Sequence, residues 1–343
     1  MTRSAVLVNL ARVADPTTLR RAITRALAEE GWPEPGWFPT PAGGSGEEQA
    51  RAAVGAGVEV LFACGGDGTV RAAAAALVGT DAVLAVLPSG TGNVLALNLG
   101  LPSDVASGVR LATRGDRRRI DLGEVDGLNF TIAAGMGLDA QVLAHTSHRA
   151  KIRFGWPAYA VAAIRHLGGP RFSVEVRLDS GPAFVRQVRS VLVANVGKLP
   201  GGITLLPDAR PDDGQLDVVL IAPRRLHEWG AILLSLRGRH AKGGRLEAFR
   251  ARRVEVTADE PQVRELDGDQ LPPGRSLVVS VWPSALTVCV PFFEPEGGHR
   301  RYPVGGRARS HRFWSAGAET LQEPPGATAP GRQSSPGDPI DPA

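Results

Sequence analysis

The sequence predicts an α/β domain with a parallel sheet, followed by a mostly antiparallel β domain. Over the first third of the chain, short apolar runs alternate with helical spacings, which is typical of strands covered by helices. From about residue 120, strand signals follow one another with few helical stretches between them. A hydrophobic fraction of 43% excludes disorder throughout, and 42 glycines with 27 prolines exclude a helical bundle.

The first domain is expected at residues 1–119. Short apolar runs predict three buried strands, at residues 5–8, 58–64 and 82–87. Helical spacing of apolar residues predicts four helices, at residues 17–29, 47–54, 70–78 and 94–99. Residues 31–46 are rich in glycine and proline, so they predict a loop.

The second domain is expected at residues 120–295, and whether its last strands return to the first domain is left open. Apolar or alternating runs predict seven strands, at residues 130–134, 172–178, 184–196, 216–221, 254–257, 277–281 and 286–290. Two helical stretches interrupt them, near residues 141–149 and 226–236. Residues 296–343 have little to bury and predict a disordered tail.

Several classes of protein are excluded by composition. Two cysteines, Cys64 and Cys289, exclude a disulfide framework and fit a reducing cytoplasm. The balance of 39 basic against 35 acidic residues is too even to predict a nucleic-acid partner. No apolar run approaches the roughly 18 residues that a membrane span needs. We therefore expect a cytoplasmic protein that binds no nucleic acid.

The strongest local signal is the run Gly65-Gly66-Asp67-Gly68-Thr69, which directly follows a predicted strand and precedes a predicted helix. Glycines let the backbone approach a bulky anion, and the helix offers free N–H groups, so the run predicts a phosphate-binding loop. A carboxylate repels phosphate, so Asp67 is expected in a solvent-facing position where it acts through Mg²⁺, a water or a substrate hydroxyl. The alternative is an ordinary strand-to-helix turn.

A second run, Pro88-Ser89-Gly90-Thr91-Gly92-Asn93, follows the next predicted strand and also leads into a helix. Loops after neighbouring parallel strands meet at the carboxyl edge of the sheet, where ligands bind. Thr91 and Asn93 would bring hydroxyl and amide groups to a nucleotide there. The sequence holds no Walker A motif, so this is not a P-loop enzyme.

Together the two runs resemble the diacylglycerol kinase catalytic domain, which is found in a lipid kinase superfamily with sphingosine kinases, ceramide kinases and soluble bacterial members. Further matches keep the family order: Leu99-Gly100-Leu101-Pro102, Ile120-Asp121-Leu122-Gly123, Ala134 to Ala140, Pro207-Asp208-Ala209, Asp213 to Asp217 and Leu266-Asp267-Gly268-Asp269. The Gly-Gly-Asp-Gly-Thr core is shared with NAD kinases. Two alternatives therefore stay open, an NAD kinase-like enzyme and a non-catalytic lipid- or nucleotide-binding protein.

The resemblance implies a nucleotide-binding α/β domain, a C-terminal β-sandwich and an active site in the cleft between them. It implies transfer of the γ-phosphoryl group of ATP to the hydroxyl of diacylglycerol or a similar lipid alcohol. The residues that would hold nucleotide are Thr40, Gly65, Gly66, Asp67, Gly68, Thr69, Val70, Arg71, Thr91 and Asn93. The family often has asparagine and glutamate where this chain has Arg71 and Ala72.

The resemblance also assigns catalytic and metal-binding roles. Asp269 lies where soluble bacterial members place a glutamate as general base, and it is one methylene shorter. Asp67 would organise Mg²⁺ and the phosphates. A structural Mg²⁺ site would take the carboxylate of Asp213 and the backbone carbonyls of Arg210 and Gln215, because oxygen ligands suit a hard cation. The alternative for this segment is an Asp-Gly hairpin turn.

Residues 224–253 carry nine basic and two acidic side chains. They form either solvated helix faces or a patch that docks on anionic lipid. Since the expected substrate is a lipid and no membrane span is predicted, we expect peripheral membrane association. The assembly is left open, with a homodimer among the alternatives.

Overall fold

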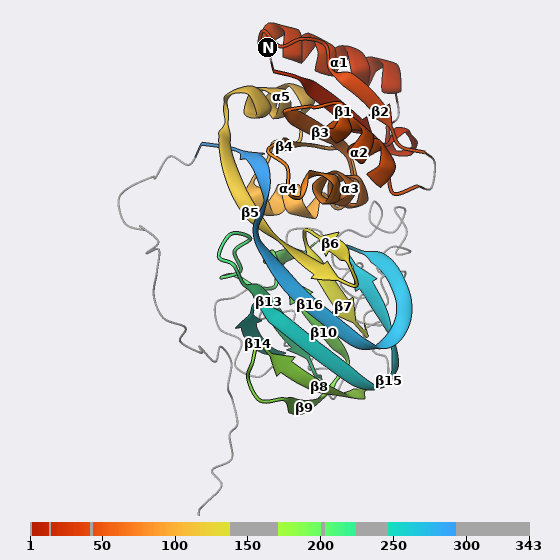
Figure 1. The fold of residues 1–343 in the computed structure, drawn as a ribbon, viewed down its shortest axis with the longest axis vertical. Coiled ribbons are helices and arrows are strands. Elements are labelled where there is room, and N and C mark those ends of the chain that lie inside the picture. The colour runs from red at the N-terminus through yellow and green to blue at the C-terminus, as the bar shows by residue number, and fades with distance from the viewer. Residues whose placement is uncertain are drawn as a thin grey trace, which may run out of the picture.

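The computed structural model describes residues 2–13, 15–41, 44–137, 171–199, 203–223 and 246–292. The N-terminal domain alternates strands and helices, as the sequence predicts (Figure 1). Its elements are β1 (Ser4–Val8), the short 3-10 helix η1 (Leu10–Arg12), α1 (Pro16–Glu29), β2 (Gly36–Pro39), α2 (Glu47–Gly55), β3 (Val60–Gly65), α3 (Asp67–Leu77), β4 (Val83–Pro88), α4 (Val94–Leu99) and α5 (Val105–Arg114).

Four parallel strands form the sheet of this domain, in the order β4-β3-β1-β2. Successive side chains of a strand point to opposite faces, so the sheet contributes side chains to two hydrophobic cores, one on each face. Val6 and Phe62 pack with α1 and α5 on one face. Leu7 and Leu61 pack with α2 and α3 on the other face, which is turned toward the C-terminal domain (Figure 1).

Two helices of the domain begin at aspartates that cap them. The Asp15 carboxylate accepts hydrogen bonds from the backbone N–H groups of Thr17 and Thr18, each at 3.0 Å, and α1 begins directly after it. The Asp104 carboxylate accepts from the N–H of Ser107 at 2.8 Å, and α5 follows. Such caps satisfy N–H groups that the helix itself leaves without partners.

Strand β2 lies inside the segment that the sequence predicts to be a loop. It is the edge strand of the sheet and pairs in parallel with β1, Val6 opposite Trp37. Glycine begins it and proline ends it, and proline is tolerated at a strand end because it has no N–H to donate. Four residues that begin with a glycine and end with a proline carry no periodic signal, so the sequence does not predict this strand. Pairing with β1, rather than local propensity, makes them a strand.

The C-terminal domain is antiparallel, as the sequence predicts, and its sandwich-like strands lie below the first domain in Figure 1. Its elements are β5 (Asp116–Val125), β6 (Leu128–Phe130), β7 (Ala133–Met136), β8 (Phe172–Leu178), β9 (Phe184–Val188), β10 (Ser190–Ala194), β11 (Lys198–Leu199), β12 (Ile203–Thr204), β13 (Leu216–Ile221), β14 (Leu246–Ala251), β15 (Arg253–Leu266) and β16 (Asp269–Val290).

The strand predicted at residues 184–196 is two strands, β9 and β10. Arg189 separates them, and its N–H donates to the carbonyl of Ile221 at 2.8 Å. Strand β9 pairs with β8, whereas β10 pairs with β7 and β13. The chain therefore changes the strands with which it pairs within one apolar run. A hydrophobic pattern does not reveal such a change.

The last strand, β16, connects the two domains. It covers both strands predicted at 277–281 and 286–290, with a register shift between Trp282 and Leu286. It pairs with β15 and β5 in the C-terminal domain, and Val288 pairs with Leu84 of β4 in the first. The main sheet is therefore continuous across both domains, and the described residues contribute fourteen strands to it. The helices expected at 141–149 and 226–236 and the tail expected at 296–343 lie outside the described residues.

Candidate active site

The two glycine-rich loops lie against each other at the carboxyl edge of the parallel sheet. The first joins β3 to α3 and the second joins β4 to α4. The backbone N–H of Ser89 donates to the carbonyl of Gly65 at 3.0 Å. A Cβ on Gly90 would overlap the Cα of Gly66, so glycine at position 90 is what lets the two backbones touch. This confirms the meeting of loops expected from neighbouring parallel strands.

The glycines of the first loop are of two kinds. A Cβ on Gly65 would overlap the side chain of Thr69, which is buried and folds back over it, so the protein itself requires that glycine. A Cβ on Gly68 would meet no protein atom within 4 Å, and Gly68 lies in the first turn of α3 with no left-handed backbone. The space beside Gly68 is open at a helix N-terminus, where backbone N–H groups favour an anion.

Asp67 connects the two loops rather than facing solvent. Its Oδ1 accepts a hydrogen bond from the N–H of Val94, the first residue of α4, at 2.7 Å. Its Oδ2 lies against Gly92, where a Cβ would approach to 2.5 Å. Burial raises the pKa of the Asp67 carboxyl, and the N–H donors at the start of α4 oppose that shift. The expected solvent-facing position is wrong, because this carboxylate serves as the cap of α4 from across the sheet edge.

Asn93 shapes the second loop with its side chain. Its Oδ1 accepts from the N–H of Gly90 at 3.0 Å, and its Nδ2 donates to the carbonyl of Gly90 at 2.8 Å. Its backbone is left-handed, with φ of 47°, a region that asparagine tolerates better than most residues. Thr91 lies exposed between these two residues. The loop therefore presents Thr91 outward while Asn93 holds the turn.

Two other predicted nucleotide residues are buried. Thr40 directly follows β2, is 6% exposed, and its hydroxyl has no hydrogen-bond partner among the described residues. The side chain of Val70 packs into the core beneath α3, so only its backbone faces the loop. The structure thus brings the backbone of Val70 to the loop, and it leaves the Thr40 hydroxyl buried at the end of β2.

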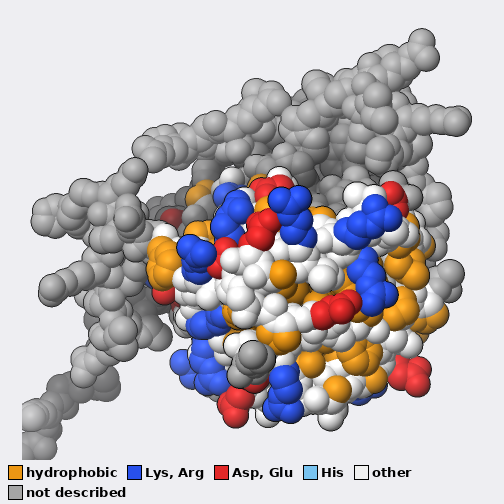
Figure 2. Space-filling view, turned by 90° about the horizontal axis from the view of Figure 1, so that it is seen from above, with side chains coloured by type: hydrophobic (Ala, Val, Ile, Leu, Met, Phe, Trp, Pro, Cys, Tyr) orange, Lys and Arg blue, Asp and Glu red, His pale blue; other side chains and the backbone are white. Residues whose placement is uncertain are grey.

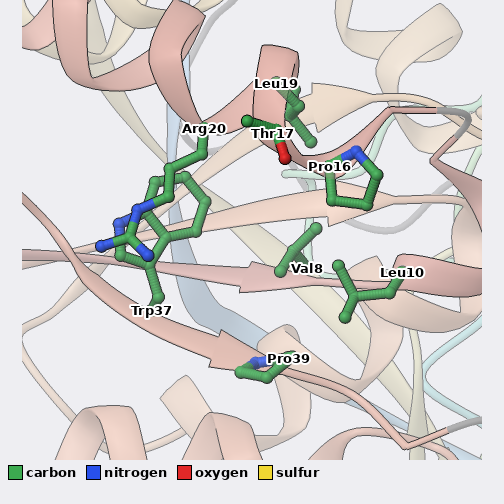
Figure 3. Close-up of a pocket in the computed structure, with 8 residues that line it drawn as sticks. All are labelled: Val8, Leu10, Pro16, Thr17, Leu19, Arg20, Trp37 and Pro39. Carbon is green, nitrogen blue, oxygen red and sulfur yellow. The ribbon is translucent and has the colours of Figure 1, made fainter.

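A pocket of about 390 Å³ lies at the carboxyl ends of β1 and β2 (Figure 3). Its lining is Val8, Leu10, Pro16, Thr17, Leu19, Arg20, Trp37 and Pro39. The guanidinium of Arg20 lies over the ring of Trp37, 5.2 Å from its centroid. None of the lining residues belongs to either glycine-rich loop, so this pocket is separate from the loops.

The predicted base, Asp269, reaches the first loop from the other domain. It begins β16, and its Oδ2 accepts a hydrogen bond from Nη2 of Arg71 on α3. The preceding Asp267 and Gly268 both have positive φ, 49° and 87°, and form the tight turn between β15 and β16. The structure therefore brings Asp269, Arg71 and the Gly65–Thr69 run together at the domain boundary, although they are distant in sequence.

Asp267 fixes that turn to the C-terminal domain. Its carboxylate accepts four hydrogen bonds of 2.8–3.0 Å, from the N–H groups of Thr131, Ile132 and Ala133 and from the Thr131 hydroxyl. Burial raises the pKa of Asp267, and these donors oppose it. Asp267 belongs to the Leu266–Asp269 motif, but no role was predicted for it; its place in an Asp-Gly turn was the available signal.

The predicted Mg²⁺ loop is crowded with carboxylates. Asp213 Oδ1 accepts from the N–H of Gln215 at 3.1 Å, and its Oδ2 lies 3.6 Å from Arg250 Nη1. Asp121, for which no role was predicted, accepts from the N–H groups of Gly214 and Ser284, each at 2.7 Å. Burial, and then neighbouring carboxylates, raise the pKa values of Asp121, Asp213 and Asp217.

Arg250 and two further arginines balance this charge in part. Arg250 Nε lies 3.0 Å from Asp217, and Arg118 Nη2 lies 2.6 Å from Asp212, which Arg210 Nε approaches at 3.4 Å. Across the described ranges, no group of three or more His, Cys, Asp and Glu side chains is arranged to hold a metal ion. A site here would depend on one carboxylate and backbone carbonyls, as the family resemblance implies.

Two family models match the chain. One, the diacylglycerol kinase catalytic domain, matches residues 6–125, and the other, the YegS C-terminal NAD kinase beta sandwich-like domain, matches residues 131–290. A Pseudomonas aeruginosa protein named "Probable lipid kinase YegS-like" is 35% identical over 250 residues, which cover 71% of this chain and 80% of the relative. The diacylglycerol kinase of Bacillus subtilis is 28% identical, over 75% of this chain and 88% of its own.

Solved structures share the fold. That of a diacylglycerol kinase from Bacillus anthracis aligns with a TM-score of 0.64 at 19% identity, over 84% of this chain and 96% of the other. Fold, loop order and relatives agree with the resemblance seen in the sequence. The chain belongs to the diacylglycerol kinase-like family of lipid kinases.

Proposed function

We propose that this protein transfers the γ-phosphoryl group of ATP to the hydroxyl of diacylglycerol or a similar lipid alcohol, with Mg²⁺. The lipid oxygen forms a bond to the γ-phosphorus, the bond from that phosphorus to the β–γ bridging oxygen breaks, and ADP leaves. Asp269 takes the proton of the lipid hydroxyl. The protein contributes mainly positioning and charge stabilisation, as phosphoryl transfer requires.

The observation that carries the nucleotide site is the open space beside Gly68. No protein contact and no backbone strain explain why position 68 is glycine. At positions 65 and 90, by contrast, a neighbouring residue leaves no room for a Cβ. A phosphate group beside the N-terminus of α3 would occupy that space and accept hydrogen bonds from the free N–H groups of the helix. Thr91 projects from the adjacent loop, and Thr40 follows β2 on the same sheet edge.

We therefore expect Gly68→Ala to weaken ATP binding at least tenfold without destabilising the fold. The added methyl group occupies the phosphate space, while alanine in a helix is more favourable than glycine by up to about 1 kcal/mol. ATP affinity by calorimetry and Tm by thermal unfolding measure the two effects.

The matched control is Gly55→Ala, because Gly55 ends α2 with equally open surroundings and lies outside both loops. It should leave ATP affinity unchanged. Unchanged ATP affinity in Gly68→Ala would contradict a phosphate site at α3.

The Mg²⁺ assignment rests on donors and charge. The carboxylate of Asp213 and the backbone carbonyls of Arg210 and Gln215 are oxygen donors on one loop, and Asp121 and Asp217 lie close to Asp213. Burial is the main cause that raises the pKa values of these three carboxyls. These residues fit a hard divalent cation. Mg²⁺ bound there would neutralise the carboxylates and stabilise the loop. A second Mg²⁺ would be bound to the nucleotide, and we propose that Asp67 positions it indirectly, by holding the loop between β4 and α4.

Peripheral docking on anionic membranes is the proposed route to the lipid. No helix in the described part of the chain is long and apolar enough to cross a membrane. Within the basic stretch 224–253, residues 224–245 lie outside the described residues, Arg250 is engaged with Asp217, and Arg252 and Arg253 are exposed. On the face that carries α1 and α5, basic and acidic side chains are interspersed (Figure 2), so that face offers no single-sign patch.

Acceptor and docking are tested together with radiolabelled ATP. We expect label to enter diacylglycerol or a related lipid alcohol in vesicles with anionic phospholipid, and transfer to fall severalfold in phosphatidylcholine vesicles or as salt rises from 0.05 to about 0.5 M. Transfer to NAD instead would favour the NAD kinase-like alternative. ATP binding without transfer to any acceptor would favour a non-catalytic sensor, and transfer indifferent to salt and lipid charge would exclude electrostatic docking.

A further inference from the structure

The ion pair between Arg71 and Asp269 joins the two domains at the centre of the proposed site. Arg71 lies in the second turn of α3, just after the phosphate loop, and Asp269 begins β16. The side chain of Arg71 is 19% exposed and that of Asp269 is 61% exposed. A largely buried guanidinium therefore holds a carboxylate that otherwise projects into solvent.

The backbone beside Asp269 is already fixed. Asp267 binds four donors from residues 131–133, and Leu266 pairs with Asp269 across the turn. What stays free is rotation of the Asp269 side chain. Arg71 removes that freedom by binding Oδ2, and among the described residues no hydrogen bond engages Oδ1. One oxygen is thus anchored and the other is left to accept a proton.

The positive charge of Arg71 also acts on Asp267, the second acid of the turn. Burial raises the pKa of Asp267, the backbone N–H donors of residues 131–133 oppose that rise, and the charge of Arg71 adds to their effect. The guanidinium of Arg71 is thus paired with Asp269, the proposed base. The contact with Asp269 points to a role in which Arg71 works through that carboxylate.

We propose that Arg71 is a positioning residue for Asp269, and that the two act as one catalytic unit across the domain boundary. The proposal rests on the proposed function, in which Asp269 is the base. A base must come within about 2.6–3.2 Å of the hydroxyl it deprotonates, and a misplacement near 1 Å can cost about 100-fold in rate. A short side chain such as aspartate reaches that position reproducibly only when its rotation is restricted.

A double-mutant cycle tests the unit. Arg71→Gln should lower kcat by about 30- to 100-fold in wild type, with the Kd for a non-hydrolysable ATP analogue within about twofold. In the Asp269→Asn background, Arg71→Gln should lower kcat by less than about twofold further, because the carboxylate that it positions is already absent. Arg71→Lys keeps the charge with a single donor group, so it should recover kcat to within about tenfold of wild type.

The controls separate this role from a structural one. The Asp269 side chain is 61% exposed, so solvent screens its pair with Arg71 and the loss of the pair costs little stability. All variants should therefore keep Tm within about 3 °C of wild type. Arg114→Gln removes an arginine that pairs with Glu30 far from the loops, and it should leave kcat unchanged.

The outcomes that would overturn the inference are distinct from those that overturn the function. If wild type is active but the two losses in kcat multiply, Arg71 acts independently of Asp269 and the inference fails. It also fails if Arg71→Gln weakens analogue binding tenfold or more, since that result assigns Arg71 to the phosphates. If wild type phosphorylates no lipid at all, the proposed function fails, and the inference fails with it.

Discussion

Asp269→Asn is expected to lower kcat by about 10²- to 10⁴-fold while the KM for ATP stays within about twofold. Asparagine keeps the shape of the side chain and its contact with Arg71, but it cannot take the proton of the lipid hydroxyl. The nucleotide loops lie on the other domain and are untouched by the change. Steady-state kinetics with labelled ATP and a dispersed lipid acceptor measure both quantities.

A suitable control is Asp81→Asn. Asp81 is exposed, and it precedes β4, so it lies at the amino edge of the sheet, away from the loops. It should leave kcat unchanged. If Asp269→Asn also left kcat unchanged, Asp269 would not be the base.

Asp67→Ala is expected to abolish measurable transfer and to destabilise the protein by about 1–2 kcal/mol, or roughly 3–8 °C in Tm. The change removes the acceptor for the N–H of Val94, so α4 loses its cap and the two glycine-rich loops lose their connection. Thermal unfolding and transfer assays on the same preparation measure both effects.

Asp67→Asn then separates structure from charge. Asparagine keeps one oxygen that can cap α4, so Tm should return to within about 2 °C of wild type. If the negative charge of Asp67 organises Mg²⁺ and phosphates, transfer should stay as low as in the alanine variant. Transfer restored together with Tm would show that Asp67 acts only by holding the loops in place.

The sequence predicts the loops because their signals are local. Each glycine-rich run follows an apolar strand and precedes a helix, and in a parallel sheet that order alone places both runs at one edge. The contact of Gly66 with Gly90 and the hydrogen bond from Ser89 to Gly65 are the geometric result. The division into an α/β and an antiparallel domain was predictable for the same reason, since each depends on the rhythm of neighbouring elements.

The partners of single polar side chains were not predictable. Arg71 and Asp269 each stood out as a departure from the family pattern, yet nothing local relates residues 198 positions apart. Asp67 was expected at the ligand, and its hydrogen bond to Val94 depends on how two loops pack. The strand β2 and the change of partners at Arg189 depend likewise on pairing between distant segments.

The path of β16 affects how the N-terminal domain folds during synthesis on the ribosome. Leu84 of β4 has its partner in Val288, so the inner edge of the nucleotide-binding sheet is completed only by the end of the β domain. At about 5–20 residues per second, the ribosome delivers that partner roughly 10–40 s after β4 has emerged. During this interval β4 is an uncovered edge, the kind of strand that pairs with foreign chains. The nascent N-terminal half should therefore depend on chaperones until synthesis has passed residue 288.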